Sequence, residues 1–125
     1  YDTTMCIMKS KKGVLVHINN SRRAVYGYDQ RLEVFGNNGM LISDNVPTND
    51  ISYYNQNLSF AKKPIKNFFI ERYKDAYQIQ LDQFIKSIKN KKNTSVTFED
   101  GKNALILANS ATKSVKLNKV VKPKF

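Results

Sequence analysis

The sequence has few of the residues that common active sites use. Its 125 residues include one cysteine, one histidine and no tryptophan. A lone cysteine excludes an internal disulfide, and Cys6 lies in an apolar run where a small buried thiol is expected rather than a reactive one, which fits a reducing, cytoplasmic compartment. His17 alone supplies neither a catalytic triad nor a zinc site, so a structural or solvent-facing role is expected for it.

Glycine patterns and long apolar runs are also missing. The five glycines never form the spacing of a dinucleotide fingerprint or of a phosphate-binding loop. The longest apolar runs, such as 14–16 and 104–108, are far below the roughly 20 residues of a membrane-spanning helix. We therefore expect one soluble domain, residues 1–125. Because the chain opens with Tyr1 and enters a strand almost at once, we expect it to be a piece of a longer protein.

Negative charge is scarce, and the formal net charge is +11. Such an excess requires that nucleic acid be considered as a partner. The lysines are spread over turns, a helix end and the C-terminal tail, however, and lysine at a helix end has a local explanation. Nucleic-acid binding is kept as the alternative function: a standalone basic module using its sheet, with Tyr26, Tyr28, Tyr53 and Tyr54 as stacking platforms.

Three β-hairpins are predicted in the first half of the chain. Their strand pairs are residues 3–9 with 13–20, 31–35 with 40–43, and 51–54 with 58–61. The second pair flanks Gly36 to Gly39, where the Asn-Gly step predicts a tight corner because both of its residues tolerate positive φ.

Two helices are predicted after Pro64. Apolar and aromatic residues recur at steps of three and four from about residue 67 to 89, which predicts a helix with one core-facing stripe. A second helix is predicted to start near Asp100 as its N-cap. Its residues Ala104, Ala108 and Ala111 lie on one side, where small side chains would allow close approach to a sheet or a helix.

Strands followed by helices indicate an α+β domain: an open, mainly antiparallel sheet with two helices on one face. In residues 5–8 and 40–42 both alternating sets of side chains are apolar, whereas a sheet with one wet face should alternate cleanly. The other face is therefore expected to meet another domain or another subunit. The alternative is that the loop of residues 47–63 folds over it.

One segment is more specific than its turns require. It reads N-S-R-R-A-V-Y-G-Y-D-Q-R-L-E-V-F-G from Asn20 to Gly36. It resembles a block in the second domain of the Gfo/Idh/MocA oxidoreductases, most of all the inositol 2-dehydrogenase branch. The stretches F-F-I-E-R-Y at 68–73 and D-G-K-N-A-L at 100–105 are similar to the helical part of that family, so the resemblance spans nearly the whole chain in order.

The resemblance implies that a Rossmann domain, holding NAD or NADP and the catalytic residues, precedes this segment. It implies no catalytic residue and no bound cofactor in this chain, which would not be catalytic alone. It also implies an α+β domain that shapes the pocket for a cyclitol or sugar and forms a homo-oligomer, a dimer or a tetramer, through its sheet face.

By the same resemblance, Tyr28 would donate its phenolic hydrogen to a substrate hydroxyl, and Gly27 would permit the turn that aims it. Tyr26, Asp29 and Arg22 are candidate neighbours in a substrate-binding site. Two alternatives stay open: Tyr28 could serve in packing, and Asp29 could form a structural ion pair with Arg31 or Arg22.

Overall fold

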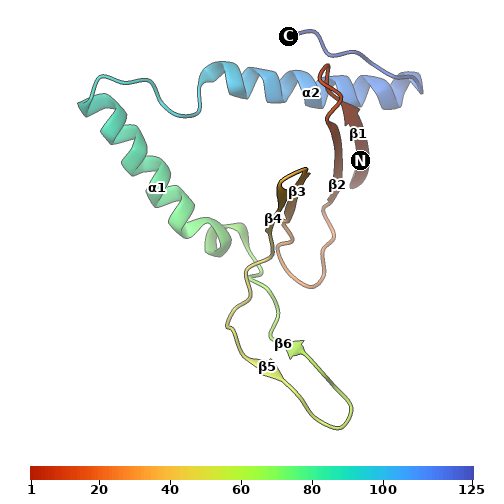
Figure 1. Ribbon diagram of the computed structural model, residues 1–125, viewed down its shortest axis with the longest axis vertical. Helices are drawn as coiled ribbons and strands as arrows, with labels where there is room; N and C mark the ends of the chain where they lie inside the picture. The colour runs from red at the N-terminus through yellow and green to blue at the C-terminus, as the bar shows by residue number, and fades with distance from the viewer. The chain divides into compact units, whose positions relative to one another are not determined.

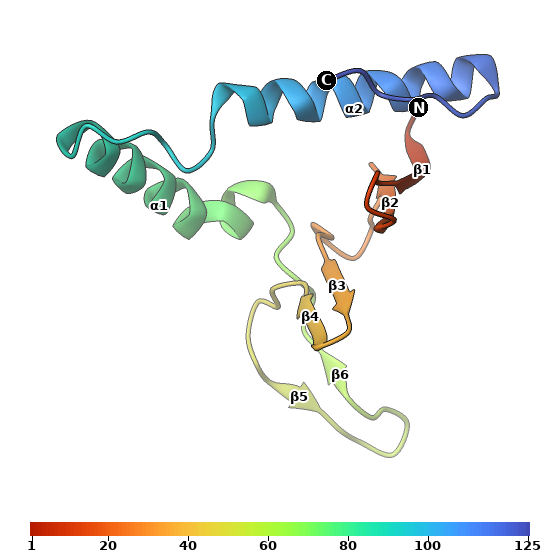
Figure 2. The same ribbon diagram turned by 45° about the horizontal axis from the view of Figure 1, so that its top comes forward.

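The computed structural model describes residues 1–125 and confirms the α+β class (Figures 1 and 2). The elements in chain order are β1 (Thr3–Lys9), β2 (Leu15–Ser21), β3 (Leu32–Gly36), β4 (Gly39–Ser43), β5 (Ser52–Tyr53), β6 (Ala61–Lys62), α1 (Phe69–Lys89) and α2 (Phe98–Leu117). The chain forms two compact units. Unit 1 comprises residues 1–4 and 19–77, and unit 2 comprises residues 5–18 and 78–125.

The strands form three separate two-stranded sheets rather than the one open sheet that was expected. Each strand pairs with its neighbour in sequence, β1 with β2, β3 with β4 and β5 with β6, because a short turn needs to close only a short loop. The last two pairs are antiparallel. The first must be antiparallel as well, since its connection is too short for a parallel crossover. The positions of the helices on one sheet face, and the use of the other face in assembly, stay predictions.

The β3–β4 hairpin is confirmed, but its corner differs from the expected one. Val34 lies opposite Leu41, and Gly36 lies opposite Gly39, so the two corner residues are Asn37 and Asn38. Neither asparagine has positive φ, and the unusual conformation falls on Gly39 at φ +141°. The predicted Asn-Gly corner is therefore displaced by one residue to Asn37-Asn38, because Gly39 is the first residue of the returning strand.

Helix α2 is confirmed, but Asp100 is not its N-cap. Thr97 holds that position, in extended backbone, and its side chain accepts a hydrogen bond from the backbone N–H of Asp100. The Asp100 carboxylate accepts in return from the backbone N–H of Thr97, over 2.8 Å. This capping box satisfies two N–H groups at the helix start. The backbone N–H of Thr97, and its hydroxyl second, both donate to the Asp100 carboxylate and hold its pKa below its usual value.

The inward face of α2 also differs from the predicted one. The half-buried residues of the helix are Asn103, Ile106, Leu107, Ser110, Ala111 and Ser114. They recur at steps of three and four and so form one stripe. Ala111 belongs to it, but Ala104 and Ala108 are exposed, which corrects the expectation of a close-approach face made by the three alanines. At the helix end Asn118 adopts the left-handed conformation, and the Ser114 hydroxyl donates to the Lys119 carbonyl over 2.6 Å, where the tail turns back (Figures 1 and 2).

Burial is the largest departure from expectation. Gly27 is the only buried residue, and no apolar side chain is fully enclosed. Large apolar side chains on the strands are exposed, for example Met5 with 70% of its surface accessible and Leu41 with 75%. Leu81 and Phe84, which fall in the predicted core stripe of α1, are exposed as well. Cys6 is half-buried rather than buried. The expected core is thus incomplete within this chain. Neither helix is long and apolar enough to cross a membrane.

Replacing the N-cap of α2 tests the assignment of the capping box. Thr97→Ala removes the side-chain acceptor and should lower the free energy of unfolding by about 1 kcal/mol. Thr112→Ala is the matched control, because the Thr112 hydroxyl donates to the Ala108 carbonyl inside the same helix and alanine is the better helix former there. Urea unfolding followed by circular dichroism at fixed protein concentration measures both. Equal losses in the two variants would contradict the assignment.

Candidate functional site

The Tyr26–Tyr28 turn lies against a short antiparallel contact in unit 1. Pro47 and Ile65 form an isolated antiparallel bridge, and the backbone N–H of Lys66 donates to the Val46 carbonyl over 3.0 Å. The turn joins this contact because the backbone N–H of Tyr28 donates to the Lys66 carbonyl over 2.9 Å. Residue 28 is thereby fixed to the segment that leads into α1.

Gly27 makes this contact possible. Its φ is +133°, a conformation that side-chain-bearing residues rarely adopt. A Cβ atom here would overlap Ile65 Cγ1 and would lie 3.0 Å and 3.1 Å from the carbonyl oxygens of Ile65 and Lys66. Both the backbone conformation and the available space therefore require glycine, as the sequence predicted for the turn.

Asp29 is the centre of a hydrogen-bond cluster. Its carboxylate accepts from Arg31 Nε at 2.8 Å, from Arg31 Nη2 at 2.9 Å and from Asn45 Nδ2 at 2.8 Å, and it also accepts from the Tyr26 hydroxyl. The Asp29 side chain is 16% exposed, whereas that of Arg31 is 62% exposed. Four donors occupy the acceptor positions of one carboxylate. Asp29 therefore holds the turn and has no free position for a further donor.

The pKa values of the cluster follow from these bonds. The bidentate Arg31 guanidinium, with the Tyr26 hydroxyl second, holds the pKa of Asp29 far below its usual range. The Asp29 carboxylate raises the pKa of Tyr26, because it stabilises the phenol that donates to it, and it raises the pKa of Arg31 as well. At neutral pH Tyr26 is thus a protonated donor whose hydrogen is committed to Asp29.

Tyr28 lies in an aromatic group with residues of α1. The rings of Tyr28 and Tyr73 meet edge to face at 5.6 Å between centroids, and Tyr73 and Tyr77 meet in the same manner at 6.2 Å. The guanidinium of Arg72 lies 5.6 Å from the centre of the Tyr73 ring. Burial, followed by the neighbouring Tyr28 phenol, raises the pKa of Tyr73. One side of the Tyr28 ring is therefore packed, and the residue is half-buried.

Gln30 connects the aromatic group to the carboxylate cluster. Its side-chain carbonyl accepts from the Tyr73 hydroxyl, and its backbone N–H donates to Asn45 Oδ1 over 2.8 Å. Asn45 in turn donates to Asp29. Asn45, Gln30 and Tyr73 are site residues that sequence reasoning missed. Tyr73 falls within the predicted stripe of apolar and aromatic residues between 67 and 89, where its hydroxyl was a usable signal, and Asn45 reads locally as an ordinary turn residue.

The predicted site residues are only partly brought together. Tyr26 and Asp29 bond directly, and Tyr28 lies in the same turn. The ion pair of Asp29 is made by Arg31, which resolves the alternative between Arg31 and Arg22. The backbone N–H of Arg22 donates to the Asp2 carbonyl over 2.9 Å, at the start of the chain. No hydrogen bond or ion pair links the Arg22 side chain to Tyr26, Tyr28 or Asp29.

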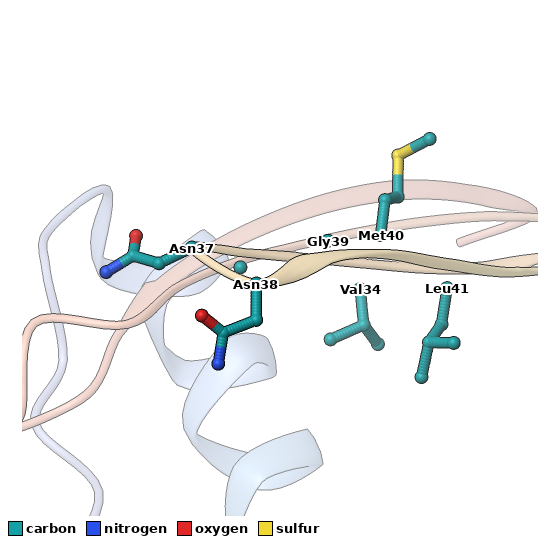
Figure 3. A pocket seen from close by; sticks show the side chains of 7 residues that line it. Val34, Asn37, Asn38, Gly39, Met40 and Leu41 are labelled. Atoms are coloured by element: carbon teal, nitrogen blue, oxygen red, sulfur yellow. The ribbon is translucent and has the colours of Figure 1, made fainter.

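A separate hollow lies at the corner of the β3–β4 hairpin (Figure 3). It has a volume of about 410 Å³, and Val34 and Leu41 point to one side of the hairpin while Met40 points to the other. Its lining contains no ionisable side chain and none of the residues around Tyr28. No group of three or more His, Cys, Asp or Glu side chains comes together as a metal site. The chemistry available at Tyr28 is therefore hydrogen bonding and ring packing.

Comparison with known proteins identifies relatives along the whole chain. Residues 1–122 match the model of the C-terminal α/β domain of the Gfo/Idh/MocA oxidoreductase family. Myo-inositol 2-dehydrogenase of Thermotoga maritima is 42% identical over 97% of this chain and 36% of its own length. Inositol 2-dehydrogenase of Rhizobium meliloti is 36% identical over 92% of this chain and 34% of its own length.

A solved structure agrees with these relatives. The crystal structure of a myo-inositol dehydrogenase from Corynebacterium glutamicum superposes with a TM-score of 0.93 at 40% identity, and it covers 100% of this chain and 38% of the other. The chain thus spans about a third of the length of the curated relatives that it matches. The nucleic-acid alternative has no support in these comparisons.

Alanine at the buried glycine should be costly. Gly27→Ala combines an unfavourable φ with a clash against Ile65 and Lys66, and should lower the free energy of unfolding by about 3 kcal/mol or more. Gly39→Ala is the matched control, because φ there is +141° but nothing lies within 4 Å of its Cβ. It should cost only about 1–2 kcal/mol for the backbone conformation. Urea unfolding measures the difference, and equal costs would show that the close approach is unimportant.

The Asp29 cluster should give unfolding a specific dependence on pH. Because its folded-state pKa is lowered, Asp29 contributes stability fully above its unfolded pKa of about 4 and loses it as the pH falls through the folded value. Arg31→Gln removes the main cause, so the urea midpoint should fall less between pH 6 and pH 3 in the variant than in the wild type. Arg23→Gln, which removes a pair with Asp2 between exposed side chains, should leave this dependence unchanged. Identical pH profiles for Arg31→Gln and the wild type would contradict the assignment.

Proposed function

The chain belongs to the Gfo/Idh/MocA oxidoreductase family as its C-terminal α/β domain, and from this premise we propose that it shapes the substrate pocket of an NAD(P)-dependent dehydrogenase acting on a cyclitol or a sugar. Inositol dehydrogenases at 42% and 36% identity support the substrate class. The hydride acceptor and the catalytic groups would come from a preceding Rossmann domain, because this chain has neither a dinucleotide glycine pattern nor a triad. The chain would not be catalytic alone.

The assignment of Tyr28 to substrate contact rests on the hydrogen bonds that the hydroxyls of Tyr26, Tyr28 and Tyr73 make. Tyr26 donates its hydrogen to Asp29, and Tyr73 donates its hydrogen to Gln30. The Tyr28 hydroxyl, in contrast, donates a hydrogen bond to no carboxylate and to no amide within unit 1. Its ring is held by Tyr73 and its backbone by Lys66. A fixed ring whose hydroxyl is bonded to neither Asp29 nor Gln30 suits a polyol, which offers an apolar ring face and hydroxyl groups.

The other predicted residues then have supporting roles. Asp29 and Tyr26 hold the turn in shape, and we assign them to positioning rather than to direct substrate contact. Arg22 is retained only as a candidate neighbour of the substrate. The exposed apolar side chains of strands β3 and β4 support assembly into a homo-oligomer, a dimer or a tetramer, since exposed patches of this kind are uncommon on monomers.

A chimera tests the proposal. In the chimera, this chain replaces the matching segment of the Thermotoga maritima relative, and the rest of that relative is kept. We expect the chimera to reduce NAD or NADP with myo-inositol or another cyclitol or sugar. Appearance of the reduced nicotinamide, measured by absorbance, reports activity, and the unaltered relative is the positive control. A chimera that binds NADH but oxidises no cyclitol and no sugar would overturn the proposal.

Within the chimera, Tyr28→Phe should lower kcat/KM by about two- to tenfold, the value of one neutral hydrogen bond. The unfolding midpoint should stay nearly unchanged, because the ring is retained. Tyr26→Phe is the matched control, because it removes a phenol hydroxyl from the same turn. It should lower the free energy of unfolding and bring the pKa of Asp29 closer to its usual value, and it should leave KM nearly unchanged. An unchanged kcat/KM in Tyr28→Phe would restrict Tyr28 to packing.

A further inference from the structure

Asn45 lies where the main chain changes its hydrogen-bonding partner. Strand β4 pairs with β3, and the last pair of that ladder is Ser43 opposite Leu32. At Val46 the same chain already pairs with the segment before α1, because the backbone N–H of Lys66 donates to the Val46 carbonyl over 3.0 Å. The change of partner therefore falls within the two residues between Ser43 and Val46.

The side chain of Asn45 bridges this change of partner. If the register of β3 and β4 continued for two more residues, Gln30 would lie opposite Asn45. The backbone N–H of Gln30 donates there to Asn45 Oδ1 over 2.8 Å, so a side-chain oxygen replaces the backbone acceptor of the ladder. Asn45 Nδ2 donates to Asp29 Oδ1 over 2.8 Å. One half-buried amide thus holds two consecutive residues, with its oxygen as acceptor and its nitrogen as donor.

Three hydrogen bonds then join three segments of unit 1 in a closed ring. The backbone N–H of Tyr28 donates to the Lys66 carbonyl, the backbone N–H of Lys66 donates to the Val46 carbonyl, and Asn45 accepts from Gln30. The first two bonds run from backbone to backbone and do not depend on side-chain identity. The third is made by a side chain, so it is the bond of the ring that a substitution removes.

The same amide is also connected to the aromatic ring of Tyr28. The side-chain carbonyl of Gln30 accepts from the Tyr73 hydroxyl, and the Tyr73 ring meets the Tyr28 ring edge to face at 5.6 Å between centroids. Asn45 therefore acts on the backbone of Tyr28 through the closed ring of bonds, and on its phenol through Gln30 and Tyr73. All of these contacts lie within the chain itself.

We propose that Asn45 is a positioning residue that sets the orientation of the Tyr28 phenol toward the substrate. The inference rests on the function proposed for Tyr28. Loss of the amide leaves the N–H of Gln30 without its acceptor and removes one donor from Asp29, so the turn is held less firmly. The Tyr28 hydroxyl then takes more orientations, and a contact that depends on orientation becomes less effective.

A double-mutant cycle in the chimera tests this role. Asn45→Ala should lower kcat/KM by about two- to tenfold, as Tyr28→Phe does. In the Tyr28→Phe background, Asn45→Ala should lower kcat/KM further by less than about twofold, because the hydroxyl that it positions is already absent. Losses that multiply in the double variant would show that Asn45 acts on another part of the protein, and would overturn the proposal.

Asn55→Ala is the matched control. Asn55 Oδ1 accepts from the backbone N–H groups of Asn57 and Leu58 over 2.8 Å and 2.9 Å, within the connection between β5 and β6. The control thus removes an asparagine side chain and two hydrogen bonds from the same unit, without altering the closed ring of bonds. It should change kcat/KM less than about twofold. Equal losses in Asn45→Ala and Asn55→Ala would contradict a specific role of Asn45.

A second variant guards against misfolding. If circular dichroism shows that Asn45→Ala loses helical content, Asn45→Ser replaces it in the cycle, because its hydroxyl leaves a polar group at the half-buried position. The side chain of serine is one bond shorter and does not reproduce the two contacts of the amide. The same lack of additivity with Tyr28→Phe is therefore expected, and multiplying losses would again overturn the proposal.

Nuclear magnetic resonance separates this inference from the proposed function. In the full chain with ¹³C-labelled tyrosine, the ring signal of Tyr28 is assigned by its loss in Tyr28→Phe. It should shift in Asn45→Ala and keep its position in Asn55→Ala. An inactive chimera together with this shift would refute the proposed function and not the positioning of the Tyr28 ring. An unshifted Tyr28 signal in Asn45→Ala would overturn the inference even in an active chimera.

Discussion

The close approach at Gly27 is the contact on which the arrangement of unit 1 depends. The absence of a Cβ lets the Tyr26–Tyr28 turn lie against the carbonyls of Ile65 and Lys66, and the Tyr28 N–H then bonds to Lys66. This bond joins a turn near residue 27 to the segment just before α1, and so it brings Tyr73 to Tyr28 across 45 positions of sequence. A larger residue would separate the two segments, and the aromatic group would lose its partner.

The cluster around Asp29 distinguishes side chains whose hydrogen bonds are made within it from Tyr28, which is bonded to it only through the chain. A carboxylate with four donors is a structural centre, because its low pKa keeps it ionised and its acceptor positions are filled. Such a group fixes a backbone without taking part in recognition. Tyr28 differs from Asp29 in this respect. Tyr73 holds its ring and Lys66 its backbone, and its hydroxyl makes no hydrogen bond to the Asp29 carboxylate. Rigid support next to an available donor is the arrangement that an oriented substrate contact requires.

Local features were predictable where a short segment determines its own structure. The first two hairpins, the end of α1 at Lys89 and the requirement for Gly27 follow from turn residues and periodicity. The third hairpin is present, but Tyr53 pairs with Ala61, so its connection is longer than the predicted one and its second strand is Ala61–Lys62 rather than residues 58–61. The errors have a common cause. Asp100 was predicted as the N-cap of α2, but Thr97 is the N-cap. Both residue types are good N-caps, and the local sequence does not tell which of the two accepts the capping bond. Asn45, Gln30 and Tyr73 join the site through contacts distant in sequence, which no local pattern records. The predicted core stripe of α1 is not enclosed within this chain, because local periodicity records which side chains face inward but not what covers them.

The exposed apolar surface has different consequences in the two units because their charges differ. Removing apolar surface from water stabilises by about 25 cal/mol per Å², so exposed side chains such as Leu41 and Phe35 favour any neighbour that covers them. In unit 1, where eight basic and seven acidic residues give a net charge of +1, a second copy meets little electrostatic resistance. In unit 2, where thirteen lysines and three acidic residues give a net charge of +10, the same apolar gain is opposed by repulsion between the two bodies. Electrostatic repulsion between identical copies is therefore weaker at unit 1 than at unit 2.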